Sequence, residues 1–206
     1  EAGFNTAFFS NQRRNHSFID FYAYQAQTTD FIRDKRPDAL DLDLAADLQE
    51  FISRSPSDKL FIVLHCYGSH FNYRERYDSS ARMFTPDKAS EASVENRSEL
   101  VNAYDNTIIA TDALIDNVIS YLAGLDIPSA LFYTSDHGED IFDDERGRFL
   151  HASPTTTFTQ LHVPFVVWIS ESYRLAFPEI VNNIEANSDL NISTSRSLFP
   201  TVMSVA

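Results

Sequence analysis

Several features are scarce in this sequence of 206 residues, and each scarcity excludes a class of protein. The single cysteine, Cys66, permits neither an internal disulfide nor a zinc site built from cysteines. With five glycines and no repeated unit, the chain is not a repeat array or a low-complexity segment. No apolar run approaches the roughly 20 residues that span a bilayer, and no signal peptide is present. The composition is therefore that of a globular domain.

Basic residues are scarce as well, because 16 Lys and Arg stand against 30 Asp and Glu, a formal net charge of −14. A surface with this charge repels nucleic-acid phosphates, so we expect no nucleic-acid partner. The charge is compatible with a bound divalent cation, but it does not favour an anionic substrate.

Hydrophobic residues are plentiful, at 43% of the chain, and they form four short runs over residues 6–10, 59–66, 130–135 and 163–170. Nearly continuous apolar runs are typical of strands covered on both faces. We therefore expect the following side chains to be buried: Phe61, Val63, Leu131, Phe132, Val166 and Trp168. Helical spacing over 42–52 and 101–122 predicts two helices, the second ending at Gly124. This order predicts an α/β layered domain with a largely parallel central sheet and helices on both faces.

Polar residues cluster where the predicted strands end, the edge at which such sheets hold their working residues. Five of the six histidines fall at or just after this edge: His16, His65, His70, His137 and His151. Asn11 and Gln12 follow the first run, as ligand contacts or as part of a capped loop beside two solvated arginines.

The segment Asp136-His137-Gly138-Glu139 follows the third run directly. It fits the start of a helix, with Asp136 as the cap and Glu139 reaching back. It equally fits a metal site, because a loop lets a neighbouring carboxylate and imidazole converge on zinc. Gly138 would then allow a sharp turn, and Glu139 would contact the substrate or support a ligand.

The other histidines differ in their surroundings. His65 ends an apolar run, which favours a packing role. His70 follows Gly68 and Ser69 in a polar loop, which favours a role in binding a metal or a phosphoryl oxygen. His151 lies in RFLHASP and is weak evidence by itself.

These motifs together resemble a known family. The segments GFNTAFFSNQ, HCYGSHFNYRERYD, NAYDNTIIATDALIDNVI, YTSDHGED, RFLHASP and LHVPFVVWIS are similar, in order and spacing, to the periplasmic catalytic domain of lipid A phosphoethanolamine transferases. That family lies within the alkaline phosphatase and sulfatase superfamily. The resemblance implies an alkaline phosphatase-like fold and a membrane-anchored enzyme with zinc and a phosphorylated threonine nucleophile.

The resemblance also implies roles for individual residues. Asp136 and His137 match the zinc-binding pair of the family. His70 and His151 match histidines that bind the transferred group or an additional zinc. Glu139 matches an acidic contact to the same group, and Asn11 or Gln12 stands where a polar substrate contact is expected.

The family's nucleophile and its remaining zinc carboxylate precede the segment with which this chain begins. We therefore expect residues 1–206 to be a single, partial sulfatase-like catalytic domain that is soluble and inactive by itself. The start EAGFNTAFFS, without an initiator Met, agrees with a piece of a longer protein. The resemblance implies that the missing N-terminal region anchors that protein at the periplasmic face of the inner membrane.

The implied activity is transfer of phosphoethanolamine from a phospholipid donor to the acceptor lipid A. Two alternatives stay open. One is a hydrolase of phosphate or sulfate esters from the same superfamily, in which water accepts the group. The other is a metal- or headgroup-binding domain without catalysis.

Overall fold

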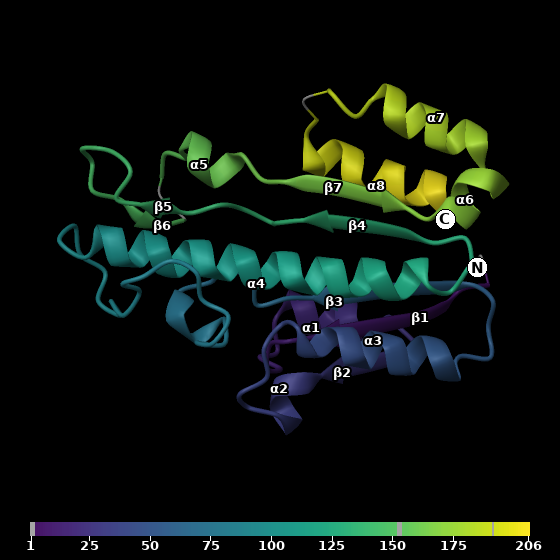
Figure 1. The fold of residues 1–206 in the computed structure, drawn as a ribbon, viewed down its shortest axis with the longest axis horizontal. Helices are drawn as coiled ribbons and strands as arrows, with labels where there is room; N and C mark the ends of the chain where they lie inside the picture. Colours follow the sequence, from purple (N-terminus) through teal and green to yellow (C-terminus); the bar gives the residue numbers. More distant parts are fainter. Residues whose placement is uncertain (1–2, 152–153, 191) are drawn as a thin grey trace. The chain divides into compact units, whose positions relative to one another are not determined.

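The structure is a computed structural model, and it describes residues 3–151, 154–190 and 192–206. The chain divides into two compact units, Glu1–Asn117 and Val118–Ala206. The division falls within the long helix α4, Arg97–Ala123 (Figure 1). Each unit is described by itself, and the expectation of a single domain stays a prediction.

The first unit is built on a three-stranded parallel sheet. Its strands are β1 (Asn5–Ser10), β2 (Thr28–Phe31) and β3 (Leu60–His65), in the order β2-β1-β3. The register pairs Ser10 with His65, so both strands reach the same sheet edge together. The remaining elements are α1 (Phe18–Ala23), α2 (Ile32–Lys35), α3 (Asp43–Arg54), the 3₁₀ helix η1 (Tyr73–Glu75) and the start of α4.

Helix α3 covers one face of this sheet. Ala7 and Phe9 of β1 lie buried in one cluster with Leu44, while Ile62 and Leu64 of β3 pack against it. Side chains alternate between the faces of a strand, so Phe61 and Val63 belong to the opposite face. The predicted burial of Phe61 is wrong, because its side chain is 42% exposed. Val63 is half-buried.

The second unit pairs its strands antiparallel. Strands β4 (Ala130–Thr134) and β7 (Phe165–Ile169) form one pair, and β5 (Asp140–Ile141) and β6 (Phe149–Leu150) form a short second pair. The helices are α5 (Phe158–Leu161), α6 (Glu171–Ala176), α7 (Pro178–Ala186) and α8 (Thr194–Val205). The predicted runs 130–135 and 163–170 are therefore strands, but they run in opposite directions.

One face of the β4–β7 pair is likewise covered within its own unit. Ile169, Tyr173 and Val181 are buried together, and Val167 packs against them. Val166 belongs to the other face and is 40% exposed, so its predicted burial is also wrong. The remaining predicted core residues are half-buried: Leu131, Phe132 and Trp168.

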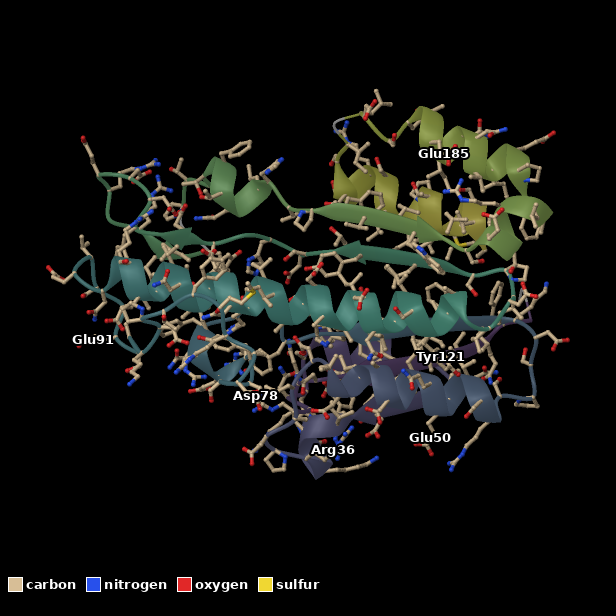
Figure 2. All side chains as sticks on the ribbon, in the orientation of Figure 1. Arg36, Glu50, Asp78, Glu91, Tyr121 and Glu185 are labelled. Carbon is tan, nitrogen blue, oxygen red and sulfur yellow. The ribbon has the colours of Figure 1, made fainter. Side chains whose placement is uncertain are left out.

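The α/β class with a parallel sheet is confirmed. The charged side chains labelled in Figure 2 come from both units and are all exposed: Arg36, Glu50, Asp78, Glu91 and Glu185. Over the described ranges, no helix combines the length and hydropathy that crossing a membrane requires.

Candidate metal centre

The segment after β4 is a loop, and no helix begins there. The Asp136 carboxylate accepts a hydrogen bond from the backbone N–H of His137 at 3.0 Å. The Ser135 hydroxyl donates to the carbonyl of His137 at 2.7 Å. These two bonds fold the backbone around His137, so the alternative that Asp136 caps a helix is wrong.

Gly138 is required by a close approach of two chain segments rather than by a left-handed turn. Its N–H donates to the carbonyl of Gln160 at 2.9 Å. A Cβ atom at this position would lie 2.0 Å from the carbonyl oxygen of Thr159. Only glycine therefore lets the loop that carries His137 pack directly against the start of α5.

Asp136 and His137 present two metal-binding atoms to the same point. Oδ2 of Asp136 lies 3.7 Å from Nε2 of His137. Two ligands of a tetrahedral zinc ion, each about 2.1 Å from it, stand about 3.4 Å apart, so this separation fits a shared ion. The pair is also accessible, since the Asp136 side chain is 87% exposed.

The tautomer of His137 favours the same arrangement. Its Nδ1 lies 3.0 Å from the carbonyl oxygen of Gly138, and because a carbonyl only accepts, Nδ1 carries the proton. The lone pair then resides on Nε2, which faces the carboxylate of Asp136. This arrangement is compatible with a cation held between the two atoms.

His151 joins this pair through its ring. The ring centroids of His137 and His151 are 3.8 Å apart. Nδ1 of His151 lies 3.3 Å from Oε1 of Glu139, whose side chain is almost fully buried. The carboxylate therefore fixes the proton on Nδ1 and again leaves Nε2 for a ligand. Leu150, with a left-handed φ of 66°, turns the chain immediately before His151.

A buried carboxylate, Asp140, braces the same loop. It accepts hydrogen bonds from the hydroxyls of Thr157 and Thr159, at 2.6 and 2.5 Å, and from the Gln160 amide at 2.7 Å. Burial by itself would raise the pKa of Asp140, but these three hydrogen bonds outweigh it and hold the pKa below its ordinary value. The charged carboxylate of Asp140 therefore holds the segment that follows Gly138 against α5 and the residue that caps it.

In the first unit, the predicted contact Asn11 is buried and already bonded. Its amide nitrogen donates to Oδ1 of Asp41 at 2.8 Å, while its own Oδ1 has no partner within the described ranges. Gln12 is half-buried, and its backbone N–H donates to the hydroxyl of Ser10. That hydroxyl lies 2.8 Å from Nδ1 of His65, which gives His65 the hydrogen-bonded, partly buried environment expected of a packing residue.

Asp41 also holds the loop that carries His70. Its two carboxylate oxygens accept hydrogen bonds from the backbone N–H groups of Tyr67 and Gly68, both at 2.7 Å. Gly68 has a φ of 60°, which favours glycine. The next residue, Ser69, bonds Thr107 of α4 through its hydroxyl at 2.5 Å. The loop is thus fixed on both sides before the chain reaches His70.

His70 is exposed and has the same tautomer as the other two predicted histidines. Its Nδ1 lies 2.6 Å from the carbonyl oxygen of Phe71, so Nδ1 carries the proton and Nε2 the lone pair. The guanidinium of Arg76 donates to the carbonyl of His70 at 2.9 Å and also lies over the ring of Tyr67. His70, His137 and His151 therefore share one feature, an Nδ1–H bound to an acceptor and an Nε2 available for a ligand.

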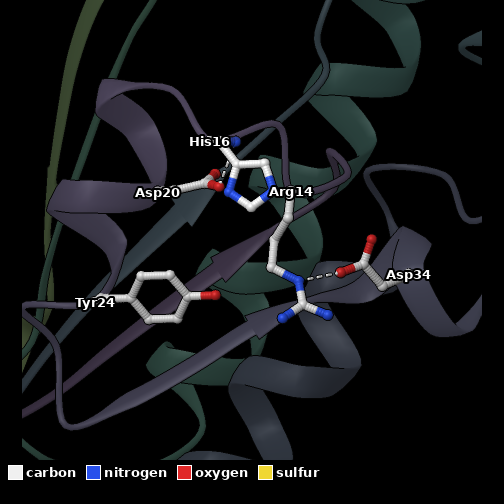
Figure 3. A pocket seen from close by; sticks show the side chains of 5 residues that line it. All are labelled: Arg14, His16, Asp20, Tyr24 and Asp34. Carbon is white, nitrogen blue, oxygen red and sulfur yellow. Dashed lines mark hydrogen bonds and ion pairs between the residues drawn. The ribbon is translucent and has the colours of Figure 1, made fainter.

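An open cavity of about 550 Å³ lies beside the segment after β1 (Figure 3). Its lining consists of Arg14, His16, Asp20, Tyr24 and Asp34. Nε of Arg14 forms an ion pair with Asp34 at 2.6 Å, and the hydrogen bond from Arg14 to Asp34, followed by that to Tyr24, raises the pKa of Arg14. No residue of the predicted zinc pair lines this cavity.

The second unit brings together four of the predicted residues: Asp136, His137, Glu139 and His151. The first unit holds Asn11, Gln12 and His70. Among the residues described, no three His, Cys, Asp or Glu side chains gather closely enough to bind a metal ion. Asp136 and His137 supply two of the three or four ligands that a zinc site normally uses, so their role as metal ligands stays a prediction.

Sequence reasoning missed Asp41 and Asp140. Asp41 had a signal, because it stands in the run Ala39-Leu40-Asp41-Leu42, where an acid flanked by apolar residues is expected to have buried partners. Asp140 follows Glu139 in an acidic stretch, and nothing in the sequence distinguishes Asp140 from acidic residues that are exposed to solvent.

Comparisons with known proteins identify the family. The family described as Sulfatase matches residues 1–206. Kdo(2)-lipid A phosphoethanolamine 7''-transferase of Escherichia coli K12 is 31% identical over 179 residues, which cover 84% of this chain and 31% of that protein. The chain thus spans about a third of that relative's length.

Two solved structures share the fold. The integral membrane protein lipooligosaccharide phosphoethanolamine transferase A of Neisseria meningitidis matches with a TM-score of 0.83 and 30% identity, over 99% of this chain and 39% of that one. The C-terminal periplasmic domain of EcEptC from Escherichia coli, in complex with Zn, matches with a TM-score of 0.74 and 22% identity, over 86% and 52% of the two chains. At that identity the second match shows the fold alone.

Proposed function

The chain belongs to the sulfatase family, and we propose that it is part of the catalytic domain of a zinc-dependent enzyme that transfers phosphoethanolamine to lipid A. The relatives named as phosphoethanolamine transferases support the reaction type. A phospholipid donor and a location at the periplasmic face of the inner membrane belong to the same proposal. The observation that supports it is the Asp136–His137 pair, whose donor atoms lie 3.7 Å apart, close to the separation of about 3.4 Å expected for two ligands of one zinc ion.

Asp136 and His137 would hold the metal through Oδ2 and Nε2. Bound zinc neutralises negative charge on phosphoryl oxygens and activates a hydroxyl nucleophile. The backbone of the loop keeps both ligands in place, because Gly138 fixes the tautomer of His137 and is itself held against α5.

His151 would position the transferred group beside this pair. When Nε2 of His151 takes up a proton, the ring donates a hydrogen bond to a phosphoryl oxygen, and the carboxylate of Glu139 balances the new charge. His70 lies in the first unit, where the carbonyl of Phe71 orients its ring, and a role for His70 in binding the transferred group is part of the same proposal. Asn11 supports the His70 loop through Asp41, and Gln12 would offer a polar contact to the substrate.

The test uses the full-length protein in vesicles that contain phosphatidylethanolamine and lipid A. We expect the mass of lipid A to rise by one phosphoethanolamine group, and the Asp136→Ala variant to lose this product. Asp144→Ala is the matched control, since Asp144 is an acidic residue of the same unit that pairs with Arg146. Release of free phosphoethanolamine without modified lipid A would instead identify a hydrolase, and no turnover of either kind would identify an inactive domain.

A further inference from the structure

Helix α1 and its C-cap residue, Tyr24, carry an exposed aromatic surface. Its four members are Phe18, Phe21, Tyr22 and Tyr24, which are 81%, 65%, 60% and 58% exposed. They lie within seven consecutive residues, whereas exposed apolar side chains on soluble proteins are usually scattered. We call these four residues the α1 aromatic surface.

The helix is held in an orientation that turns its rings outward. Ala23 is fully buried and Asp20 is 7% exposed, so α1 faces the protein with a small and a charged residue. Asp20 accepts a hydrogen bond from the backbone N–H of His16 at 2.8 Å, and Thr29 donates to the carbonyl of Ala23 at 2.7 Å. A helix of a soluble domain normally buries its apolar side, so this orientation is the reverse of the ordinary one.

The sequence around this surface is poor in acidic residues, although the whole chain is strongly negative. Between residues 12 and 29, Asp20 is the only acidic residue in the sequence, and it is buried. Arg13 and Arg14 lie in the loop before α1 and are exposed. Arg14 forms an ion pair with Asp34 at 2.6 Å, and Figure 3 shows its guanidinium beside Tyr24 and Asp34. The segment is therefore aromatic, with Arg13 as its exposed cation outside this ion pair.

We propose that the α1 aromatic surface lies in the interfacial layer of a negatively charged phospholipid bilayer, with Arg13 at the level of the headgroups. Aromatic rings together with Lys or Arg are the side chains that proteins place at this layer. The proposal goes beyond the proposed transfer reaction, because it concerns how the domain contacts the membrane and not what it catalyses.

The size of the surface favours a bilayer over a protein partner. Four partly exposed rings offer on the order of 500 Å², since a complete aromatic side chain buries about 200 Å². A stable protein interface needs about 800 Å² on each side. A bilayer requires no matching partner surface, and burial of one ring favours the membrane about tenfold.

The test measures which medium surrounds α1 in the full-length protein reconstituted in bilayers of phosphatidylethanolamine and phosphatidylglycerol. A nitroxide spin label is attached in Phe18→Cys and, separately, in Phe21→Cys. Collisions of the label with lipid-soluble oxygen and with a water-soluble nickel chelate are then compared. Burial raises the pKa of the Cys66 thiol, so at neutral pH Cys66 reacts slowly with the labelling reagent.

Met83→Cys is the matched control, because Met83 is an apolar residue of the same unit and is 73% exposed. We expect the ratio of oxygen to nickel collisions at positions 18 and 21 to exceed that at position 83 several-fold. Equal ratios would show that α1 faces water and would overturn the proposal. Low collision rates with both reagents would show a protein contact and would overturn it as well.

Discussion

Replacing Gly138 with alanine tests the close approach that holds the loop of the candidate metal centre. The added Cβ would lie 2.0 Å from the carbonyl oxygen of Thr159, a separation that real Cβ atoms do not show. The two segments must move apart by at least 1 Å, which strains or breaks the 2.9 Å hydrogen bond from Gly138 to Gln160. Overpacking costs about 1–3 kcal/mol and a lost hydrogen bond about 1 kcal/mol, so we expect Gly138→Ala to lower the free energy of unfolding by about 2–4 kcal/mol.

Denaturant unfolding of the purified protein measures this change. Gly124→Ala is the control, since a Cβ at Gly124 would make only ordinary contacts, the nearest at 3.4 Å to the carbonyl oxygen of Tyr121. We expect the control to change the free energy of unfolding by less than about 0.5 kcal/mol. If both variants unfold at the same denaturant concentration, the two segments are not in contact and the geometry deduced for His137 is wrong.

Three further predictions concern charged and titrating groups. The pKa of Asp140 is lower in the folded than in the unfolded chain. The stability that Asp140 contributes is therefore complete above the unfolded pKa of about 4 and is lost as the pH falls through the folded pKa. Asp140→Asn should flatten this part of a curve of stability against pH. Asp41→Ala should lower the free energy of unfolding by about 2–5 kcal/mol, because it leaves one buried and two half-buried donors without this acceptor, and unchanged stability would refute this role. His70→Ala and His151→Ala should each reduce transfer to lipid A by roughly 100-fold with little change in thermal unfolding. The control His162→Ala, at an exposed histidine, should retain normal transfer. Near-normal transfer in the His70 and His151 variants would show that both histidines are ordinary loop residues.

Strands β1 and β3 of the first unit could be predicted because their apolar runs are long compared with their polar flanks. The predicted burial of Phe61 and Val166 is wrong, because a continuous apolar run does not show which face of a strand the rest of its unit covers. Strand β2 was missed because its sequence, TTDF, is short and mostly polar. The antiparallel direction of β7 was missed because hydrophobicity does not encode strand direction.

The candidate site was easier to predict where its residues are adjacent in sequence. Asp136 and His137 are neighbours in a loop, so one quoted segment contained both possible ligands. The contact between His137 and His151 depends on the short β5–β6 pair and on the left-handed Leu150, which no sequence pattern indicated. Asp41 accepts hydrogen bonds from Asn11, 30 positions before it in the sequence, and from Tyr67, 26 positions after it. Such long-range pairing of polar groups is set by the fold rather than by local sequence.

The zinc content of the purified full-length protein tests the central claim most directly. The account predicts that the wild-type protein and the Asp144→Ala control hold zinc, and that Asp136→Ala and His137→Ala lose most of it, because each removes one of two converging donor atoms. Equal zinc content in all four proteins would contradict the assignment of Asp136 and His137 as metal ligands.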